Sequence, residues 1–312
     1  KEVTELFQEI GQEISKAVTS VQRSDIGKIV SEVVDEVKDS IFGMMGAMGG
    51  TDEKQSITEQ LDWTFDAAGV SKIDAQTSNG EIALDGSGEG QVTVYAWKKV
   101  SARTQAEAEE FAQQVQVHVE QHGDEIRIYK EHPKPPSGIN VGVRYEIQSP
   151  STVDIDLRSS NGMIQVHGVN GAIDVVTSNG KIELQGVTGR IEARTSNGKI
   201  EASVGLRDEG IFSTSNGAID VKILEGVAPI SATTSNGSID LTLPADFSGQ
   251  LNAKTSNGRV HSDFPIPVTE PLKNSLVGQI GAGGEATVKL RSSNGSIYLR
   301  AQGHMQGVSH NA

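Results

Sequence analysis

The tripeptide Ser-Asn-Gly occurs eight times in this chain of 312 residues, and the repeat limits the possible folds more than any other feature. Successive copies lie 82, 18, 18, 19, 20, 21 and 37 residues apart. The last interval is close to two ordinary ones, which predicts a degenerate repeat near residues 274–279. The asparagines of the eight copies are Asn79, Asn161, Asn179, Asn197, Asn216, Asn236, Asn257 and Asn294.

The clearest repeat unit, residues 180–197, contains two short runs in which apolar and polar residues alternate. Ile182 and Leu184 share one face of the first run, and Ile191 and Ala193 share one face of the second. Alternation with a period of two, bounded by glycines, is typical of half-buried strands. Each unit is therefore predicted to form two strands.

Two strands per unit can form hairpins or the coils of a solenoid, and the turn residues favour coils because they also recur in register. The residue two before each asparagine always carries a hydroxyl group: Thr77, Ser159, Thr177, Thr195, Thr214, Thr234, Thr255 and Ser292. In a parallel stack these residues and the asparagines would form two polar ladders. Strand parity predicts that both ladders face inward, and the following glycine is expected to supply a positive φ. If its amide is buried, Asn197→Ala should cost about 1–3 kcal/mol of stability.

The predicted fold class is all-β, a parallel β-solenoid of short two-strand coils with an N-terminal α-helical segment and a small inserted α+β cap. The predicted domains are an amphipathic helical segment at 1–50, first strands and first coil at 51–90, the cap at 91–148, solenoid repeats at 149–300 and a flexible tail at 301–312. Within the cap, Thr104 and Glu107 form a capping-box pattern before a short helix.

Residues 1–50 carry an apolar stripe at helical spacing, formed by Val3, Phe7, Ile10, Ile14, Ala17, Val21, Ile26, Val30, Val33, Val37 and Ile41. Three roles remain open for this segment. It could pack on itself or cap the rod, it could drive self-association, or it could lie on a membrane surface. Its polar face is acidic, which disfavours anionic lipid because membrane-surface helices usually carry Lys and Arg.

The composition excludes several classes of site. The chain has no cysteine, which rules out disulfides, thiolate metal ligands and cysteine nucleophiles. A net charge of −14 is unusual for a nucleic-acid binder. No run of about 20 apolar residues is present to span a membrane. The chain begins at Lys1, which leaves open an upstream signal peptide or lipoprotein signal.

A search for catalytic, cofactor-binding or metal-ligating residues finds no candidate, so the sequence predicts a protein that is not an enzyme and has no cofactor. Asp154 and Asp156 share a strand face, but we expect no carboxylates of neighbouring coils to line up with them. His118 and His122 are four residues apart on a predicted strand, where that spacing is not expected to converge. The repeated serines have no histidine or acid at a fixed offset.

The repeated Thr-Ser-Asn-Gly-x-Ile-x-Leu pattern resembles the bacterial putative adhesin family, over roughly residues 60–300. The resemblance includes the segment from Val92 to Ile147, which is similar to that family's lead-in to its repeats. It implies a β-strand-repeat domain, and it adds little about activity because the family's function is largely unknown.

These observations favour a non-catalytic structural or adhesive protein, located at the cell surface or outside the cell. It would act through a rigid solenoid, by self-association through residues 1–50 or the solenoid ends, or by binding a surface or matrix partner. The alternative is a membrane-associated envelope-stress sensor at the cytoplasmic face of the membrane, which would use residues 1–50 to bind a partner. Peripheral contact with a membrane is also left open. A carbohydrate-active β-helix enzyme is a minor alternative. No nucleic-acid partner is expected.

Overall fold

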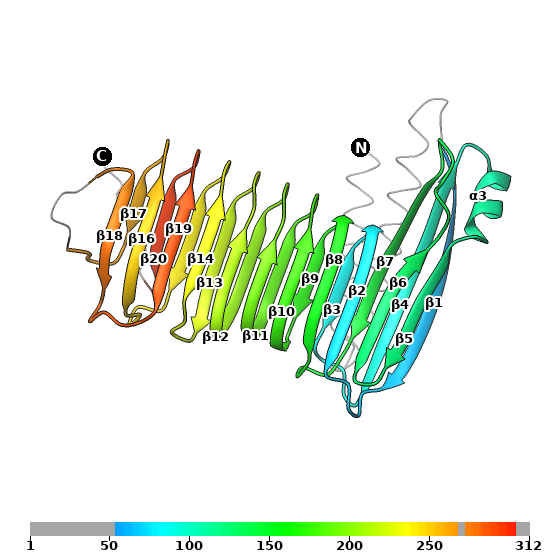
Figure 1. Cartoon of the computed structure of the whole chain (residues 1–312), viewed down its shortest axis with the longest axis horizontal. Coiled ribbons are helices and arrows are strands. Elements are labelled where there is room, and N and C mark those ends of the chain that lie inside the picture. The colour runs from blue at the N-terminus through cyan, green and yellow to red at the C-terminus, as the bar shows by residue number, and fades with distance from the viewer. Residues whose placement is uncertain (1–53, 268–271, 304–312) are drawn as a thin grey trace, which may run out of the picture. The chain divides into compact units, whose positions relative to one another are not determined.

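The computed structural model describes residues 54–267 and 272–303. Residues Gln55–Ala312 form one compact unit, distinct from residues Lys1–Lys54. The helical segment predicted at 1–50 and most of the tail predicted at 301–312 therefore lie outside the described residues. The unit from Gln55 onward is a rod of stacked strands (Figure 1).

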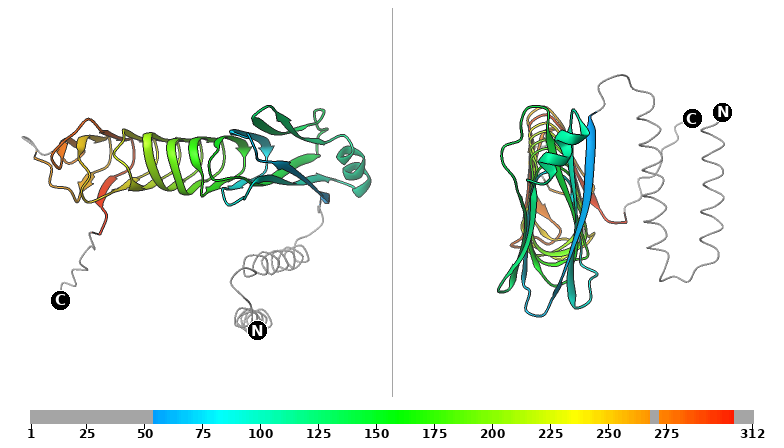
Figure 2. Two further views of the ribbon diagram at one scale, coloured as in Figure 1. Left: turned by 90° about the horizontal axis from the view of Figure 1, so that it is seen from below. Right: turned by 90° about the vertical axis from the view of Figure 1, so that its right-hand side faces the viewer.

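The rod consists of two facing sheets, visible as two layers in the end-on view (Figure 2). Following the strand pairings, sheet I runs through β5 (Gln116–His122), β6 (Glu125–Glu131), β2 (Lys72–Asn79), β8 (Asp154–Asn161), β10 (Asn170–Thr177), β11 (Ile182–Arg194), β12 (Ile200–Ser213), β14 (Ile230–Thr234), β19 (Thr287–Ser292), β16 (Gly249–Thr255) and β18 (Ser275–Ile280).

Sheet II runs through β1 (Gln55–Asp66), β4 (Gln91–Ala102), β7 (Asn140–Gln148), β3 (Ile82–Asp85), β9 (Ile164–His167), the first parts of β11 and β12, β13 (Ile219–Glu225), β15 (Ile239–Leu243), β20 (Ile297–Ala301) and β17 (Val260–Ser262). β11 and β12 bend from sheet II into sheet I, so the two sheets share these strands. The coils pair in parallel with equivalent residues opposite each other, which confirms the predicted solenoid.

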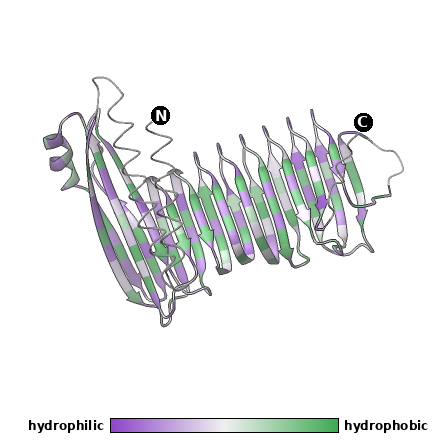
Figure 3. Ribbon diagram, turned by 180° about the vertical axis from the view of Figure 1, so that it is seen from behind, coloured by the Kyte–Doolittle hydropathy of each residue, from purple (hydrophilic) through white to green (hydrophobic). Residues whose placement is uncertain are grey.

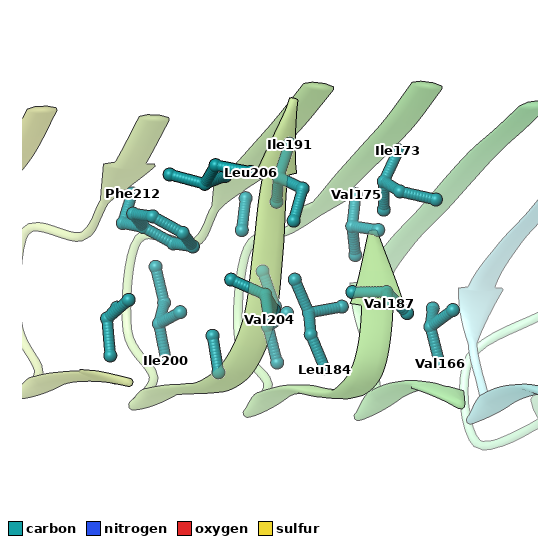
Figure 4. Close-up of a cluster of buried hydrophobic side chains, with 14 of the residues drawn as sticks. Val166, Ile173, Val175, Leu184, Val187, Ile191, Ile200, Val204, Leu206 and Phe212 are labelled. Atoms are coloured by element: carbon teal, nitrogen blue, oxygen red, sulfur yellow. The ribbon is translucent and has the colours of Figure 1, made fainter. Parts of the chain in front are cut away.

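The core fills the space between the sheets. Ile182, Leu184, Ile191 and Ala193 all face inward and are fully buried, as the alternation predicted. Figure 4 shows the same arrangement in neighbouring coils, with Val166, Leu184 and Ile200 along one side of the core and Ile173, Ile191 and Phe212 along the other. Hydropathy alternates along the strands, because every second residue faces water (Figure 3).

The hydroxyl ladder lies inside the rod at one corner of each coil. Thr195 Oγ1 donates a hydrogen bond of 3.0 Å to the carbonyl oxygen of Gly180 in the preceding coil. Thr177 and Thr214 make the same contact with Gly162 and Gly198. All eight hydroxyl residues are buried: Thr77, Ser159, Thr177, Thr195, Thr214, Thr234, Thr255 and Ser292. Seven of these hydroxyls donate to the carbonyl oxygen of a corner glycine in a neighbouring coil, and Thr77 donates to that of Val143 in the cap.

The asparagine ladder lies on the outside of the same corner. Asn197 Nδ2 donates to Asn179 Oδ1 at 2.8 Å, and the amide of Asn216 donates to Asn197 in the same way. These asparagines are exposed, so the expectation that their ladder faces inward is wrong. Strand parity stops after Arg194, because the chain bends at residues 196–198 and turns the amide outward.

The glycine that follows each asparagine is required by close packing, and the expected positive φ is wrong for most copies. Of the eight corner glycines, Gly80 alone has a positive φ, of 150°. A Cβ on Gly198 would lie 1.8 Å from the carbonyl oxygen of Gly180, and one on Gly180 would lie 1.9 Å from that of Gly162. Only glycine lets the corners of successive coils approach so closely.

The order of the coils departs from the chain order at the C-terminal end. Asn294 donates to Asn236 at 2.8 Å, and Asn257 donates to Asn294 at 2.7 Å. The last coil, β19–β20, therefore lies between the coils of Asn236 and Asn257. The degenerate repeat expected at residues 274–279 is wrong as well, since β18 there runs antiparallel to β16 and ends sheet I.

The cap extends both sheets at the N-terminal end. β6 pairs in parallel with β2, and β7 pairs in parallel with β3, so the cap lies over the first coil. Helix α3 (Gln105–Ala112) begins after Thr104, whose hydroxyl accepts from the Glu107 amide. The Glu107 carboxylate accepts from the Thr104 amide, which confirms the capping box.

We predict that Thr195→Val destabilises the rod more than Asn197→Ala. The valine leaves a buried carbonyl without its donor, at a cost of about 1–3 kcal/mol, whereas loss of one exposed amide hydrogen bond costs about 0.5–1.5 kcal/mol. Urea unfolding measures both, and Ser196→Ala, an exposed neighbour, serves as the control. A larger cost for Asn197→Ala than for Thr195→Val would contradict the outward placement of the asparagines.

We also predict that Gly198→Ala lowers the free energy of unfolding by at least about 2 kcal/mol, because its methyl group meets backbone that cannot move aside without separating two coils. Gly284→Ala is the matched control. A Cβ at Gly284 meets its nearest atom at 3.4 Å, an ordinary contact, so the change should stay within about 0.5 kcal/mol. Equal costs at the two sites, measured by urea unfolding, would refute the close-packing explanation.

Candidate interaction surface

The outer faces of the sheets carry side chains in rows, because equivalent positions of parallel coils lie side by side. On sheet II, the register aligns Glu183, Glu201, Asp220 and Asp240 on four successive strands. On sheet I, it aligns Asp74, Asp156, Asp174 and Glu192. The expectation that carboxylates of neighbouring coils do not line up is therefore wrong.

Basic side chains cross-link the acidic row of sheet II. Lys181 Nζ lies 2.9 Å from Glu183 and also pairs with Glu201, while Lys199 pairs with Glu201 and lies 3.7 Å from Asp220. Hydrogen bonds from Lys181 and then Lys199 lower the pKa of Glu201. Exposed pairs of this kind contribute about 0–1 kcal/mol each, so the row mainly fixes side-chain positions on a flat face.

The acidic row of sheet I is less evenly compensated. Arg158 pairs with Asp156 at 2.8 Å, and Arg190 pairs with Glu192 at 3.0 Å. Burial, followed by the neighbouring Asp156 carboxylate, raises the pKa of Asp74. Among residues 54–267 and 272–303, no group of three or more His, Asp or Glu side chains could hold a metal ion.

His118 and His122 meet the same carboxylate on the outer face of β5, so the expectation that they do not converge is wrong in part. His122 Nε2 lies 3.0 Å from Glu120 Oε2, and His118 Nδ1 lies 3.7 Å from Glu120 Oε1. His118 also stacks on Tyr129, with ring centroids 4.8 Å apart. The histidines contact opposite oxygens of one acid and form no ligand set.

A shallow depression of about 330 Å³ interrupts the flat outer face of sheet II. It lies over Ala83, which the register places between Glu146 of β7 and Gln165 of β9. All other coils have a longer side chain at this position: Gln165, Glu183, Glu201, Asp220, Asp240, Tyr298 and His261. The short side chain of Ala83 therefore creates the depression.

Polar side chains and one aromatic ring surround this depression. Asp85 Oδ2 and His167 Nδ1 lie 3.3 Å apart on one side, and Tyr95 and Glu146 lie on another. Tyr95 continues to Trp97, with ring centroids 6.2 Å apart. The carboxylate side chains of Asp85 and Glu146 are 45% and 39% exposed. The site offers several hydrogen-bonding groups beside an aromatic ring, and it remains open to water.

The sequence motifs did not predict this depression, because it arises from one short side chain in a regular row and not from residues with a recognisable chemistry. The signal was present: Ala83 stands where every other repeat has a larger residue. The predicted ladder residues lie elsewhere, at the corner of the coils, where they hold the stack together and line no part of the depression.

Comparison with known proteins identifies the fold family. The Toastrack DUF4097 family model matches residues 143–300, just over half of the chain. The chain belongs to the Toastrack DUF4097 family. No curated protein matches it. The family name, like the earlier resemblance to putative adhesins, refers to no enzymatic activity.

Solved structures similar to this Toastrack chain include a putative cell adhesion protein from Clostridium sporogenes, with 12% identity, coverage of 79% of this chain and 100% of that one, and a TM-score of 0.34. A putative adhesin from Bacteroides fragilis has 14% identity, coverage of 80% and 100%, and a TM-score of 0.30. A putative lipid binding protein from Parabacteroides distasonis has 11% identity, coverage of 78% and 96%, and a TM-score of 0.29. With TM-scores this low, none of their names carries over.

No helix within the described part of the Toastrack chain is both long and apolar enough to cross a membrane.

We predict that Asp74→Asn raises the free energy of unfolding at pH 7. An aspartate whose folded-state pKa is raised costs stability at pH values above that pKa, and the cost vanishes below the unfolded value of about 4. The gain should therefore be absent near pH 3. Urea unfolding at both pH values measures it.

Asp240→Asn serves as the control for this prediction, because Asp240 accepts 2.8 Å hydrogen bonds from Arg300 Nε at both oxygens. Its substitution should lower stability at pH 7. If Asp74→Asn is also destabilising at pH 7, the unfavourable placement of Asp74 in its row is refuted.

Proposed function

We propose that this protein is a non-catalytic adhesive module at the cell surface or outside the cell. It presents a rigid rod and binds a hydroxyl-rich surface glycan at the depression over Ala83. The observation that carries the proposal is the break in the side-chain row at Ala83, which makes room beside Tyr95, Asp85 and His167. The rest of the described outer rows of sheet II lack both the space and this combination.

The chemistry of the depression suits a sugar. Carboxylate, amide and imidazole groups accept or donate hydrogen bonds to hydroxyl groups, here from Asp85, Gln165 and His167. An aromatic ring such as Tyr95 covers the apolar face of a pyranose. Since the depression is open at the sides, it can accept a residue within a polysaccharide chain as well as at its end.

The same geometry argues against hydrolysis. A general acid needs a raised pKa, which burial in an apolar pocket normally provides. Asp85 and Glu146 are instead well exposed, and Glu146 pairs with Arg144. The arrangement supports binding of a glycan without cleavage.

The rod supplies rigidity, which an adhesive surface needs to keep its binding groups in place. The hydroxyl and asparagine ladders and the bridged acidic row each connect successive coils. Self-association through residues 1–50 or the rod ends would multiply such sites and raise the avidity of surface binding.

Affinity electrophoresis through gels that contain xylan, dextran or galactomannan, with sedimentation on purified peptidoglycan, tests the proposal. We expect the wild-type protein to be retarded or sedimented by at least one of these polymers. Ala83→Gln should weaken that binding at least about tenfold, equal to about 1.4 kcal/mol. The fold accepts this change because Gln165 already occupies the same position in the next coil.

Asp220→Asn is the matched control, since it alters the same row on a strand outside the depression. It should leave binding unchanged. If Ala83→Gln binds as strongly as the wild type, the depression is not the binding site. If the wild type binds none of the four polymers, the proposal that the ligand is a glycan is refuted. Release of new reducing ends would show that the protein is an enzyme.

A further inference from the structure

The outer face of sheet I changes its charge along the rod. The row that begins at Asp74 carries acids on four successive strands, the last of them Glu192. The acids then stop. The register continues this row through β12, β14, β19 and β16 with Ile211, Ser231, Lys289 and Asn252.

A second row of the same face lies two residues further along each strand, and its N-terminal part is basic. Arg158 and Arg194 occupy this row on β8 and β11. Arg158 pairs with Asp156 at 2.8 Å, and Arg194 pairs with Glu192. The acids of the first row thus neutralise the cations of the second in these coils.

The second row is basic again at the C-terminal end of the sheet, where the acids are absent from the first. Arg291 of β19 lies opposite Lys254 of β16, and Lys289 stands two residues before Arg291. β16, β18 and β19 lie together at this end of the rod (Figure 1). All three cations are exposed, and none forms an ion pair with a carboxylate of the described residues. We call Lys254, Lys289 and Arg291 the basic patch.

Along most of the rod, positive charge is offset by a nearby acid. The basic side chains that form ion pairs within residues 54–267 and 272–303 are Lys72, Lys98, Arg127, Arg144, Arg158, Lys181, Arg190, Arg194, Lys199 and Arg300. The basic patch differs because its three cations occupy neighbouring positions of one face without such a partner. In a chain with a net charge of −14, this is a local reversal of sign.

The patch is flat, and its charges are closely spaced. Lys289 and Arg291 are two residues apart on one strand, about 6.6 Å between their Cα atoms, and Lys254 lies on the next strand, about 4.8 Å from Arg291. The register places only neutral polar residues on the other sides of these cations: Ser231, Thr233, Asn252 and Ser275. Their hydroxyl and amide groups can donate further hydrogen bonds.

This combination suits a flexible polymer with repeated phosphate groups. A guanidinium such as that of Arg291 can bind one phosphate through two hydrogen bonds, and each lysine adds a compact charge. Among the described residues, no aromatic ring lies beside the three cations in the register. Sugar rings and nucleobases usually stack on such a ring, so the patch favours a polymer without either.

We propose that the basic patch binds a phosphodiester-linked polyol chain. The acidic row from Asp74 to Glu192 repels the same polymer and confines it to the C-terminal end of the face. This inference is independent of the glycan site, which lies over Ala83 on sheet II and has an aromatic ring beside it.

Isothermal titration calorimetry of the full-length chain with lipid-free poly(glycerol phosphate), in about 0.1 M NaCl, tests the proposal. We expect binding that weakens as salt is raised, because bound phosphates release their counterions. Lys254→Gln, Lys289→Gln and Arg291→Gln combined should weaken binding at least about tenfold. The slope of log affinity against log salt concentration should become shallower by about two, as expected for three lost phosphate contacts.

Lys134→Gln, Arg207→Gln and Lys222→Gln combined are the matched control. They remove the same charge from exposed positions outside the patch, and none of the three residues forms an ion pair with a described residue. The affinity should stay nearly unchanged, because charges more than a Debye length from the polymer are screened. Urea unfolding verifies that both triple variants keep the stability of the wild type.

Absence of binding by the wild type, or an equal loss in the two triple variants, would overturn the proposal. Tighter binding to alginate, duplex DNA or phosphatidylglycerol vesicles than to poly(glycerol phosphate) would assign another partner and overturn it as well. Ala83→Gln should bind poly(glycerol phosphate) as the wild type does, so the two proposed sites fail or succeed separately. Loss of that binding in Ala83→Gln would contradict the placement on sheet I.

Discussion

The close approach of successive coils at the glycine corner is the constraint on which the rest of the rod depends. The carbonyl oxygen of Gly180 lies where a side chain on Gly198 would begin, and the same oxygen accepts from Thr195. One corner thus combines the absence of a side chain, a buried hydroxyl donor and an exposed asparagine. Because each corner is equivalent to the next, the coils stack in register, and neighbouring strands lie about 4.8 Å apart.

Stacking in register has consequences on both sides of each sheet. Inside, it gives columns of identical or similar apolar residues, such as Ile164, Ile182 and Ile200, which are all fully buried. Outside, it places like charges side by side, as in the row from Asp74 to Glu192. Bridging lysines offset that repulsion on sheet II, whereas Asp74 on sheet I keeps an unfavourable carboxylate neighbour in Asp156.

Features that suit binding arise where the repeat is broken. Ala83 removes one side chain from a regular row and creates the depression beside Tyr95. On sheet I, the row that is acidic from Asp74 to Glu192 continues to Lys289, so the basic patch at the C-terminal end has no acidic partner among the described residues. In a repeat protein each repeat contacts only its neighbours, so a break in the repeat or an end of the stack changes the surface locally.

The sequence by itself determined the coils, the inward face of each strand, the cap with its helix at Thr104, and the position of the hydroxyl and asparagine residues in register. These depend on local periodicity, which a chain carries in its own order. Only the tertiary structure decided that Asn197 faces outward, that Gly198 is needed for contact with Gly180, and that the coil of Asn294 lies between those of Asn236 and Asn257. Such properties depend on which coil stacks on which. Because the coils have nearly the same residues at the positions that pair, the sequence does not show the order in which they stack.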